Sequence, residues 1–515
     1  MRYVGGQDLQ GYTGSSPRVR TVRRTCLLPR GRKNCKIAVM TSDVIIIGAG
    51  ISGAAVAREL SRYKLKIFLL EKEAEPAFGV SKSNSGIIHA GTQNPPSSMK
   101  GWLCVEGNRL LREELAGDLG LNFTQCGQLV VIFDPADLPE LEKIKKQGEE
   151  LGVKGLELVD RTWLEKNEPN LGPEVKAALL VPSTGIISPY RFVYALVENA
   201  VRNGVELRTS RKVTVIRRPE SGGFEVVAGG EVYRAKFLVN AAGLYADEIS
   251  ALAGAPSFKI TPRKGEEYLL DKKREHIANR IIFPLPSKNS KGILIIKTAD
   301  GNPMIGPTAH DAEDKEDLST SDEGLAEVLA GARRLMPSIS RGDIIAYFAG
   351  LRPVSGKDFI IRHEDSAPGL VTVAGIQSPG LTAAPAIAVM VADILKQRGL
   401  RLEPRENFHR LRPRPPHLSE LSPAETRRLI EKNPAYGDIV CRCELVSAAE
   451  IRDAVKRGAR TMDGVKFRTR AQAGRCHGGF CTARIMKIMH EELGFPVTAV
   501  TKRGPGSELI KDERK

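Results

Sequence analysis

The sequence predicts an α/β protein with a large Rossmann-like domain and a small helical C-terminal module, and three observations support this fold class. The chain has 515 residues, about three times the length of a typical domain, so one small module is excluded. A glycine-rich turn lies between two apolar runs near residue 48, and four of the eight cysteines form two close pairs near the C-terminus. No run of about 18 apolar residues occurs, so we do not expect a membrane-spanning helix.

Positive charge is concentrated at the start of the chain. The net charge is +16, and residues 1–40 carry nine Arg or Lys against one acidic residue. The rest of the chain shows no basic stripe interleaved with aromatic residues, so a nucleic-acid partner is not predicted. Residues 1–39 lack apolar periodicity, and we interpret them as a disordered extension or a segment that is not translated. The alternative is a targeting peptide, because the segment is rich in arginine and poor in acids.

The strongest motif is a strand, turn, helix and strand unit over residues 43–71. An apolar run is followed by Gly48, Gly50 and Gly53 in a Gly-x-Gly-x-x-Gly turn, then by a helical pattern and a second strand that ends in Glu71. In such a unit the glycines allow a tight turn, close approach of a pyrophosphate and close packing of the helix, and the acid binds a ribose. This unit predicts a dinucleotide-binding domain.

Four further segments follow the glycine motif in a characteristic order, at residues 83–91, 239–243, 350–353 and 375–382. With that motif they resemble the FAD-dependent D-amino-acid oxidase superfamily, and within it the anaerobic-type glycerol-3-phosphate dehydrogenases and the L-2-hydroxyglutarate oxidases. The resemblance implies an FAD-dependent oxidoreductase over residues 40–400, with an α+β substrate domain inserted at about 121–184 and 256–345. It places the following residues against FAD: Gly48, Gly50, Ser52, Gly53, Glu71, Lys72, Ser83, Asn84, Ser85, Val213, Ala242, Gly243, Gly350, Ser378, Gly380, Leu381 and Thr382.

Two element predictions accompany this family assignment. Residues 205–217, 223–228 and 235–239 read as a small meander whose last strand leads back to the cofactor. Ser378 to Gly380 stand where the N-cap and first turn of an apolar helix belong, before residues 381–395. The N-terminus of that helix would stabilise negative charge on the reduced flavin, whereas the alternative is an ordinary buried helix.

The C-terminal module is predicted to bind a metal cluster. Residues 401–435 form a proline-rich linker, and residues 436–515 contain Cys441 and Cys443 as C-x-C and Cys476 and Cys481 as C-x4-C. Four thiolates suit a 2Fe-2S cluster, and a four-cysteine zinc site is the alternative. The segment resembles the bacterioferritin-associated-ferredoxin-like domain of anaerobic-type glycerol-3-phosphate dehydrogenases, and a helix over residues 447–457 would bring the cysteine pairs together.

A cluster beside a flavin indicates that electrons leave one at a time. We therefore expect an electron-acceptor protein or partner subunit, and a reducing, cytoplasmic compartment, with membrane attachment only through such a partner. An electron-relay subunit without a substrate of its own is a further alternative.

The substrate is predicted to be a small anionic secondary alcohol. The resemblance assigns Arg352 and Arg362 to its anionic end, and we expect Tyr268 to line the pocket. His89 is a candidate base for the hydroxyl, or it holds the flavin loop. The first choice is glycerol 3-phosphate oxidised to dihydroxyacetone phosphate, and the alternatives are L-2-hydroxyglutarate and an amino acid or opine.

Overall fold

A computed structural model describes residues 39–286 and 291–511. Our prediction for residues 1–39 therefore lies outside the described residues, except for Val39. That residue already begins β1 (Val39–Ile47) and pairs with Val232.

The first sheet is built around the predicted glycine motif. Strand β1 leads into α1 (Ile51–Leu60) and then into β2 (Ile67–Leu70), and β1 and β2 pair in parallel. Residues 44–47 of β1 and all four residues of β2 are almost fully buried, as expected for a parallel sheet covered on both faces. The sheet continues outward in the order β18 (Ile360–His363), β19 (Leu370–Ala374), β11 (Glu231–Asn240), β1, β2 and β8 (Glu206–Arg208).

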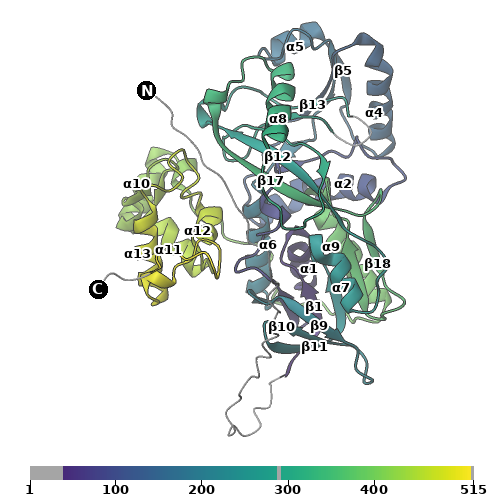
Figure 1. The fold of residues 1–515 in the computed structure, drawn as a ribbon, viewed down its shortest axis with the longest axis vertical. Helices are drawn as coiled ribbons and strands as arrows, with labels where there is room; N and C mark the ends of the chain where they lie inside the picture. The colour runs from purple at the N-terminus through teal and green to yellow at the C-terminus, as the bar shows by residue number, and fades with distance from the viewer. Residues whose placement is uncertain (1–38, 287–290, 512–515) are drawn as a thin grey trace, which may run out of the picture. The chain divides into compact units, whose positions relative to one another are not determined.

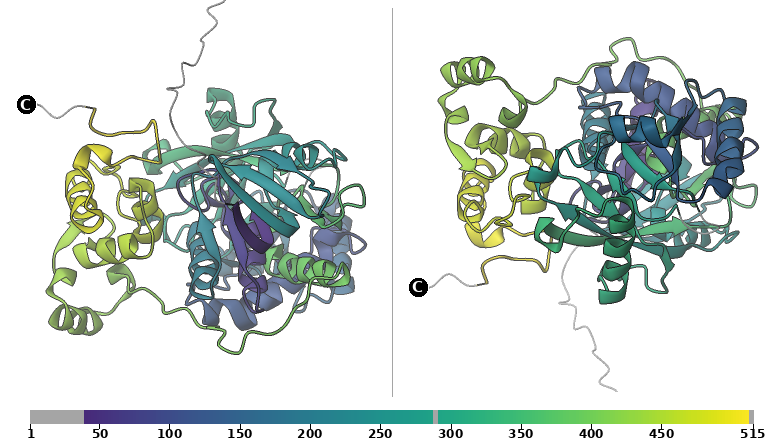
Figure 2. Two further views of the ribbon diagram at one scale, coloured as in Figure 1. Left: turned by 90° about the horizontal axis from the view of Figure 1, so that it is seen from below. Right: turned by 90° about the horizontal axis from the view of Figure 1, so that it is seen from above.

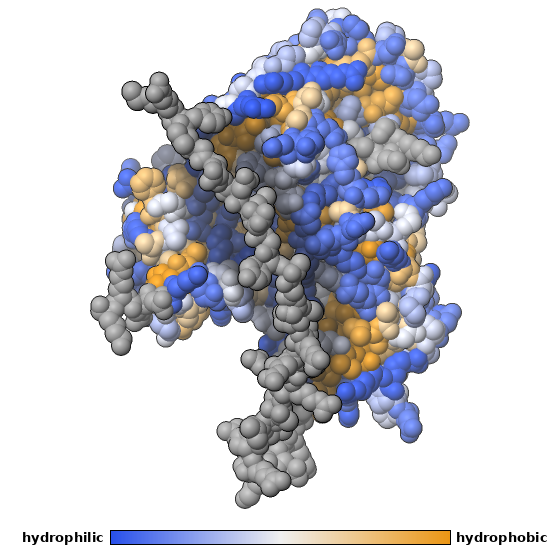
Figure 3. Space-filling view, in the orientation of Figure 1, coloured by the Kyte–Doolittle hydropathy of each residue, from blue (hydrophilic) through white to orange (hydrophobic). Residues whose placement is uncertain are grey.

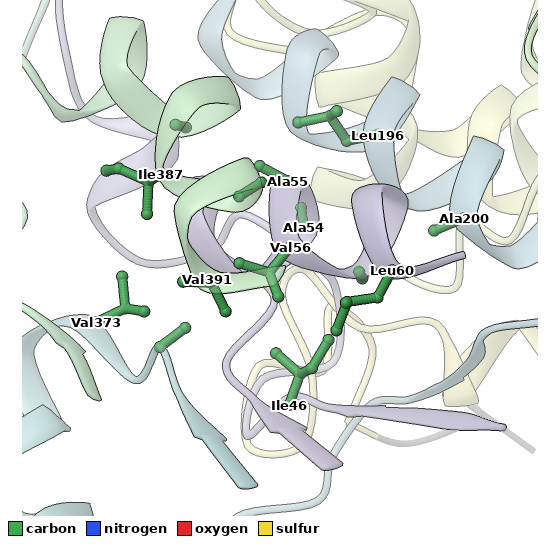
Figure 4. Packing of buried hydrophobic residues seen from close by; sticks show 14 of the residues in the cluster. Ile46, Ala54, Ala55, Val56, Leu60, Leu196, Ala200, Val373, Ile387 and Val391 are labelled. Atoms are coloured by element: carbon green, nitrogen blue, oxygen red, sulfur yellow. The ribbon is translucent and has the colours of Figure 1, made fainter. Parts of the chain in front are cut away.

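Three helices form the core against this sheet. Figure 4 shows side chains of α1, of α6 (Pro189–Arg202) and of α9 (Gly380–Gln397) packed above Ile46 of β1. Val56 and Val391 belong to this cluster and are fully buried. Helix α9 is long and apolar enough to cross a membrane by length and composition, but most of it is buried in this core.

The predicted meander is present, with one correction. Strands β9 (Val213–Arg217), β10 (Phe224–Ala228) and β11 pair antiparallel in sequence. The expectation of one continuous strand over residues 205–217 is wrong, because the chain turns at Ser210, whose φ is +54°. The first half, β8, instead extends the sheet beside β2 in parallel.

A second, mostly antiparallel sheet takes its nine strands from two separate parts of the chain. Its longest pair is β12 (Thr261–Leu270) with β17 (Ile344–Val354), labelled at the centre of Figure 1. The other strands are β4 (Gln128–Ile132), β5 (Glu157–Asp160), β6 (Ala177–Val181), β13 (Ile281–Pro284), β14 (Leu294–Ile296), β15 (Met304–Gly306) and β16 (His310–Asp311). The remaining short strands are β3 (Ile87–Ile88) and β7 (Gly185–Ile186), which pair with each other.

Helices complete both sheet layers. They are α2 (Met99–Leu110), α3 (Ala116–Asp118), α4 (Leu138–Glu150), α5 (Arg161–Asn167), α7 (Ala246–Leu252) and α8 (Asp322–Leu335). In the face drawn in Figure 3, hydrophilic side chains predominate and apolar ones gather in separate areas.

The proline-rich linker is held on the first domain. The Arg405 guanidinium donates to the carbonyls of Ser61 and Tyr63, and the amides of Asn199 and Asn203 donate to the carbonyl of His409. The linker then forms a helix of its own, α10 (Pro423–Lys432).

The C-terminal module is small and helical, as predicted. It contains β20 (Ile439–Cys441), β21 (Val446–Ser447), α11 (Ala448–Lys456), α12 (Met462–Thr469) and α13 (Thr482–Leu493), which Figure 2 draws in yellow-green and yellow. Helix α11 matches the predicted helix, and Ser447 caps it in a capping box with Glu450.

Candidate active site

A cavity of about 790 Å³ opens along the end of the parallel sheet and reaches the second sheet. Its volume lies within the range of small-molecule and cofactor sites. It lies where β1 and β2 end, which is where ligands bind in open α/β sheets. The predicted residues that line it are Gly48, Gly50, Ser52, Glu71, Lys72, Ser83, Asn84, Ser85, His89, Val213, Ala242, Gly243, Gly350, Arg352, Ser378, Gly380 and Leu381.

The glycine turn forms a cradle that side chains would fill. Gly48 has φ +102°, and a Cβ on it would lie 2.4 Å from the carbonyl oxygen of Ala241. A Cβ on Gly53 would lie 1.9 Å from the Gly48 oxygen, so this glycine serves helix packing and lies behind the cavity wall. Beside the turn, the amide of Ile51 at the start of α1 donates to Ser81 Oγ at 2.9 Å. The N-terminal amides of α1 and the glycine backbone without side chains lie at the same place, and together they suit a pyrophosphate.

Glu71 lies buried at the end of β2, as the motif predicts. Its carboxylate accepts hydrogen bonds from the amides of Ala49 at 2.8 Å and Glu73 at 2.9 Å. Burial raises the pKa of this carboxyl, and the two amides oppose the shift. Next to it, the Lys72 ammonium lies 4.3 Å from the ring centre of Tyr245.

Three side chains meet at the opposite end of the cavity. His89 Nε2 lies 3.3 Å from Ser378 Oγ, and Lys291 Nζ donates to the same oxygen at 3.4 Å. Burial, and then the charge of Lys291, hold the pKa of His89 well below its usual value, so the imidazole is neutral near pH 7. Burial also lowers the pKa of Lys291 to about 8. A neutral imidazole beside a hydroxyl can accept a proton.

Arg352 and Glu267 form the wall next to this group. The Arg352 Nη2 donates to the carbonyl of Thr308 at 3.1 Å, and the side chain passes over Gly265, where a Cβ would lie 2.5 Å from Nη2. Burial raises the pKa of Glu267 to about 7, and the positive charge of Arg352 opposes the shift. The remaining donors of the Arg352 fork can bind an anion in the cavity.

Two predicted substrate residues lie outside the cavity wall. Gly265 and Glu267 face the cavity, so Tyr268 points to the other side of β12, where its ring lies 6.3 Å from that of Tyr347. Arg362 on β18 is half exposed, donating to Ser257 Oγ at 2.8 Å and to Glu364 at 3.3 Å. Both assignments to the substrate site are therefore corrected.

Two predictions at the start of α9 also need correction. The helix begins at Gly380 with Pro379 at its N-cap, and Ser378 faces His89 and Lys291 instead of capping the helix. Thr382 is fully buried behind the wall, where its hydroxyl accepts from the amide of His89 at 3.0 Å. Thr382 thus positions the His89 backbone.

Lys291 and Glu267 are charged residues of this end that the sequence does not predict. Lys291 stands between β13 and β14 in no motif. Glu267 is the neighbour of the predicted residue Tyr268. Alternation along a strand indicates that the two side chains point to opposite faces, but the sequence alone does not reveal which face meets the cofactor.

The four C-terminal cysteines lie in two pairs. Cys443 Sγ and Cys476 Sγ lie 3.6 Å apart, and Cys441 lies beside Cys481, so each pair joins one residue of C-x-C to one of C-x4-C. Two thiolates on one tetrahedral metal ion with bonds of about 2.3 Å lie roughly 3.7 Å apart. The spacing of Cys443 and Cys476 therefore suits thiolates that share an iron of a cluster.

Comparison with known proteins agrees with this geometry. Residues 43–394 match the family model described as FAD dependent oxidoreductase. The chain belongs to this family. Residues 439–491 match the BFD-like [2Fe-2S] binding domain, which favours the iron–sulfur cluster over the zinc alternative.

Individual relatives of this FAD-dependent oxidoreductase extend the comparison. The chain is 42% identical over 471 residues to a glycerol 3-phosphate dehydrogenase of Caloramator mitchellensis, covering 91% of this chain and 98% of the relative. It is 33% identical to a glycerol 3-phosphate oxidase of Mycoplasma pneumoniae, covering 67% and 92%. The solved structure of dithionite-reduced L-α-glycerophosphate oxidase from Mycoplasma pneumoniae with FAD bound superimposes with a TM-score of 0.70 at 31% identity, covering 73% of this chain and all of that one.

The cofactors of the chain are thus FAD and a 2Fe-2S cluster. The glycine cradle, Glu71 and the α1 N-terminus fit the dinucleotide, and the four cysteines fit the cluster.

Proposed function

We propose that this FAD-dependent oxidoreductase oxidises glycerol 3-phosphate to dihydroxyacetone phosphate and passes the electrons through its 2Fe-2S cluster to an acceptor protein. The observation that carries the proposal is the group of two cations and a neutral imidazole at one end of the cavity, formed by Arg352, Lys291 and His89. Two cations suit a phosphate dianion, and the imidazole suits a hydroxyl. The names of the relatives support this choice of substrate.

Each residue has a separate task in this proposal. Arg352 binds the anionic end through its free guanidinium donors, and Lys291 adds a second positive charge. His89 Nε2 accepts the hydroxyl proton of the substrate, whose hydroxyl replaces the Ser378 hydroxyl at that ring nitrogen, and Thr382 holds the backbone of His89. Bound FAD supplies the hydride acceptor.

An anaerobic substrate panel tests the proposal. Purified holoenzyme is mixed with glycerol 3-phosphate, L-2-hydroxyglutarate or a series of amino acids, and loss of flavin absorbance is followed. We expect bleaching by glycerol 3-phosphate alone. Bleaching by L-2-hydroxyglutarate or an amino acid would assign that substrate instead, and no bleaching by any of them would favour an electron-relay subunit.

Variants of Arg352 test how the anion is bound. We expect Arg352→Ala to raise KM by about 100-fold, because a charge-assisted, two-pronged contact is lost. Arg352→Lys keeps the charge without the planar fork and should recover only part of the affinity. Unchanged KM in both variants, with FAD still bound, would remove Arg352 from the substrate site.

The acceptor is proposed to dock beside the cluster. Phe480 lies between Cys476 and Cys481 and is 86% exposed, and Leu445, two residues after Cys443, is 45% exposed. We infer that these two exposed apolar side chains, each within two residues of a cysteine of the group, contact the acceptor. The dehydrogenase is then a cytoplasmic enzyme that reaches a membrane only through such a partner.

A further inference from the structure

The C-terminal module contacts the loop that follows β2, next to the predicted ribose site. Glu75 of that loop is buried, and its carboxylate accepts from the amide of Arg460 at 2.6 Å and from that of Thr461 at 3.3 Å. Thr461 is the N-cap of α12, so a carboxylate of the FAD domain lies at the positive end of a helix of the module. The same carboxylate pairs with buried Arg468 at 2.9 Å.

An aromatic contact joins the same helix to the cavity wall. Phe467 of α12 packs edge-on against Phe78, with ring centres 6.0 Å apart, and Phe78 lines the cavity. Ser81, three residues on, accepts from the first amide of α1. The position of α12 is therefore coupled by direct contact to the loop that shapes the cavity beside the glycine turn.

One residue of the module reaches the cavity itself. Among the described residues after 401, Arg503 alone lines the cavity. It also lines a neighbouring pocket with Lys72, Glu73 and Lys212, which are part of the cavity wall as well. The loop that carries it is held close, because a Cβ on Gly504 would lie 3.1 Å from Ala74 Cβ. Burial lowers the pKa of Lys82 on the same side, and Arg503 contributes to that shift. Arg503 thus adds positive charge where a dinucleotide carries its phosphates and adenosine.

We propose that the C-terminal module completes the FAD site. Arg503 binds the adenosine half of FAD, so that FAD binding and docking of the cluster module stabilise each other. Such coupling is reciprocal, since whatever strengthens one equilibrium must strengthen the other by the same factor. In this arrangement the cluster module docks more tightly on the FAD domain when FAD is bound than when FAD is absent.

The contribution of Arg503 to FAD binding is tested by titrating the full-length apoprotein with FAD and following the quenching of flavin fluorescence. We expect Arg503→Ala to weaken FAD binding by about tenfold, the usual scale of one charge-assisted contact, and Arg503→Lys to recover part of it. Arg484→Ala is the matched control, since Arg484 is an exposed arginine of the module that pairs with Asp438 and does not line the cavity. Equal FAD affinity in wild type and Arg503→Ala would overturn the proposal.

The effect of FAD on docking of the module is tested by trypsin cleavage. The segment 401–435 contains many arginines, and in wild type we expect FAD to slow its cleavage. In Arg503→Ala, FAD should lose most of this protective effect. In Glu75→Gln, both the protection by FAD and the FAD affinity should fall. The iron content should stay unchanged in both variants, which checks that the module is folded. Equal protection by FAD in wild type and Arg503→Ala would contradict the coupling. These measurements need no substrate, so their outcome is separate from that of the substrate assignment.

Discussion

At the scale of single residues, Lys291 sets the protonation of its neighbour. Its positive charge adds to burial in lowering the pKa of His89. We expect Lys291→Met to raise the pKa of His89, because one repulsive cation is removed. A base must be deprotonated to act, so the acid limb of the profile of kcat/KM against pH should move to higher pH.

This shift is measured from pH 5 to 8 with Lys154→Met as control, since Lys154 is an exposed lysine away from the cavity. An acid limb that stays in place in Lys291→Met would exclude His89 as the group that titrates.

Glu267 is the second residue whose charge bears on the substrate. Its pKa is raised to about 7, so it is mostly neutral below pH 7 and mostly ionised above. Once ionised, it competes with an anionic substrate for Arg352. We therefore expect KM of the wild type to rise above pH 7, and Glu267→Gln to bind the substrate about three- to tenfold more tightly at pH 8.

The comparison is made at pH 6 and pH 8, with Glu275→Gln as an exposed control on the same domain. Lys291 also loses charge toward pH 8, in both proteins alike, so the decisive quantity is the difference between them. If Glu267→Gln binds the substrate no more tightly than wild type at pH 8, the carboxyl is not the competing group.

At the scale of elements, the strand pair β12 and β17 positions the substrate residues. Arg352 on β17 pairs with Arg263 on β12, and its side chain reaches the cavity across Gly265, two residues further along β12 on the same face. We expect Gly265→Ala to push the flexible end of Arg352 aside and to raise KM by about tenfold, with FAD still bound.

Gly342→Ala is the matched control, because its Cβ would meet no atom closer than 3.6 Å. KM and FAD content are measured for both variants. A normal KM in Gly265→Ala would show that Arg352 can bind the substrate from another rotamer.

The same elements show what sequence can predict. The Gly-x-Gly-x-x-Gly unit is local, since strand, turn, helix and acid follow one another within 29 residues, and the structure places Gly48, Gly50 and Glu71 as expected. The sequence predicts Tyr268 in the pocket, whereas the structure has its neighbour Glu267 there, because a shift of one residue along a strand exchanges its two faces. Lys291 belongs to a loop without a motif, and only tertiary folding brings it to His89.

At the scale of the whole molecule, β12 and β17 also connect the two cofactor sites. His477, next to Cys476, lies 2.9 Å from the carbonyl of Ile345 at the start of β17, and Gly350 further along this strand lines the flavin cavity. At about 3.3 Å per residue, these two points lie roughly 17 Å apart. Arg475 pairs with Asp271 just past the end of β12, which holds the cysteine loop in this place. The cluster therefore stands at one end of a rigid strand pair and the flavin site at the other.

This arrangement predicts that the two halves of the reaction can be separated. Cys476→Ser removes one thiolate ligand, so we expect the visible absorption of the cluster to vanish. Bleaching of the flavin by substrate should keep its rate, because the variant leaves Arg352, His89 and the FAD cradle unchanged. Reoxidation by a one-electron acceptor should slow by at least tenfold, since the flavin loses its direct route to the surface. Cys126→Ser is the control, as Cys126 is outside the cysteine group and should leave both rates unaltered. Reoxidation at the wild-type rate in Cys476→Ser would mean that electrons leave the flavin without passing through the cluster.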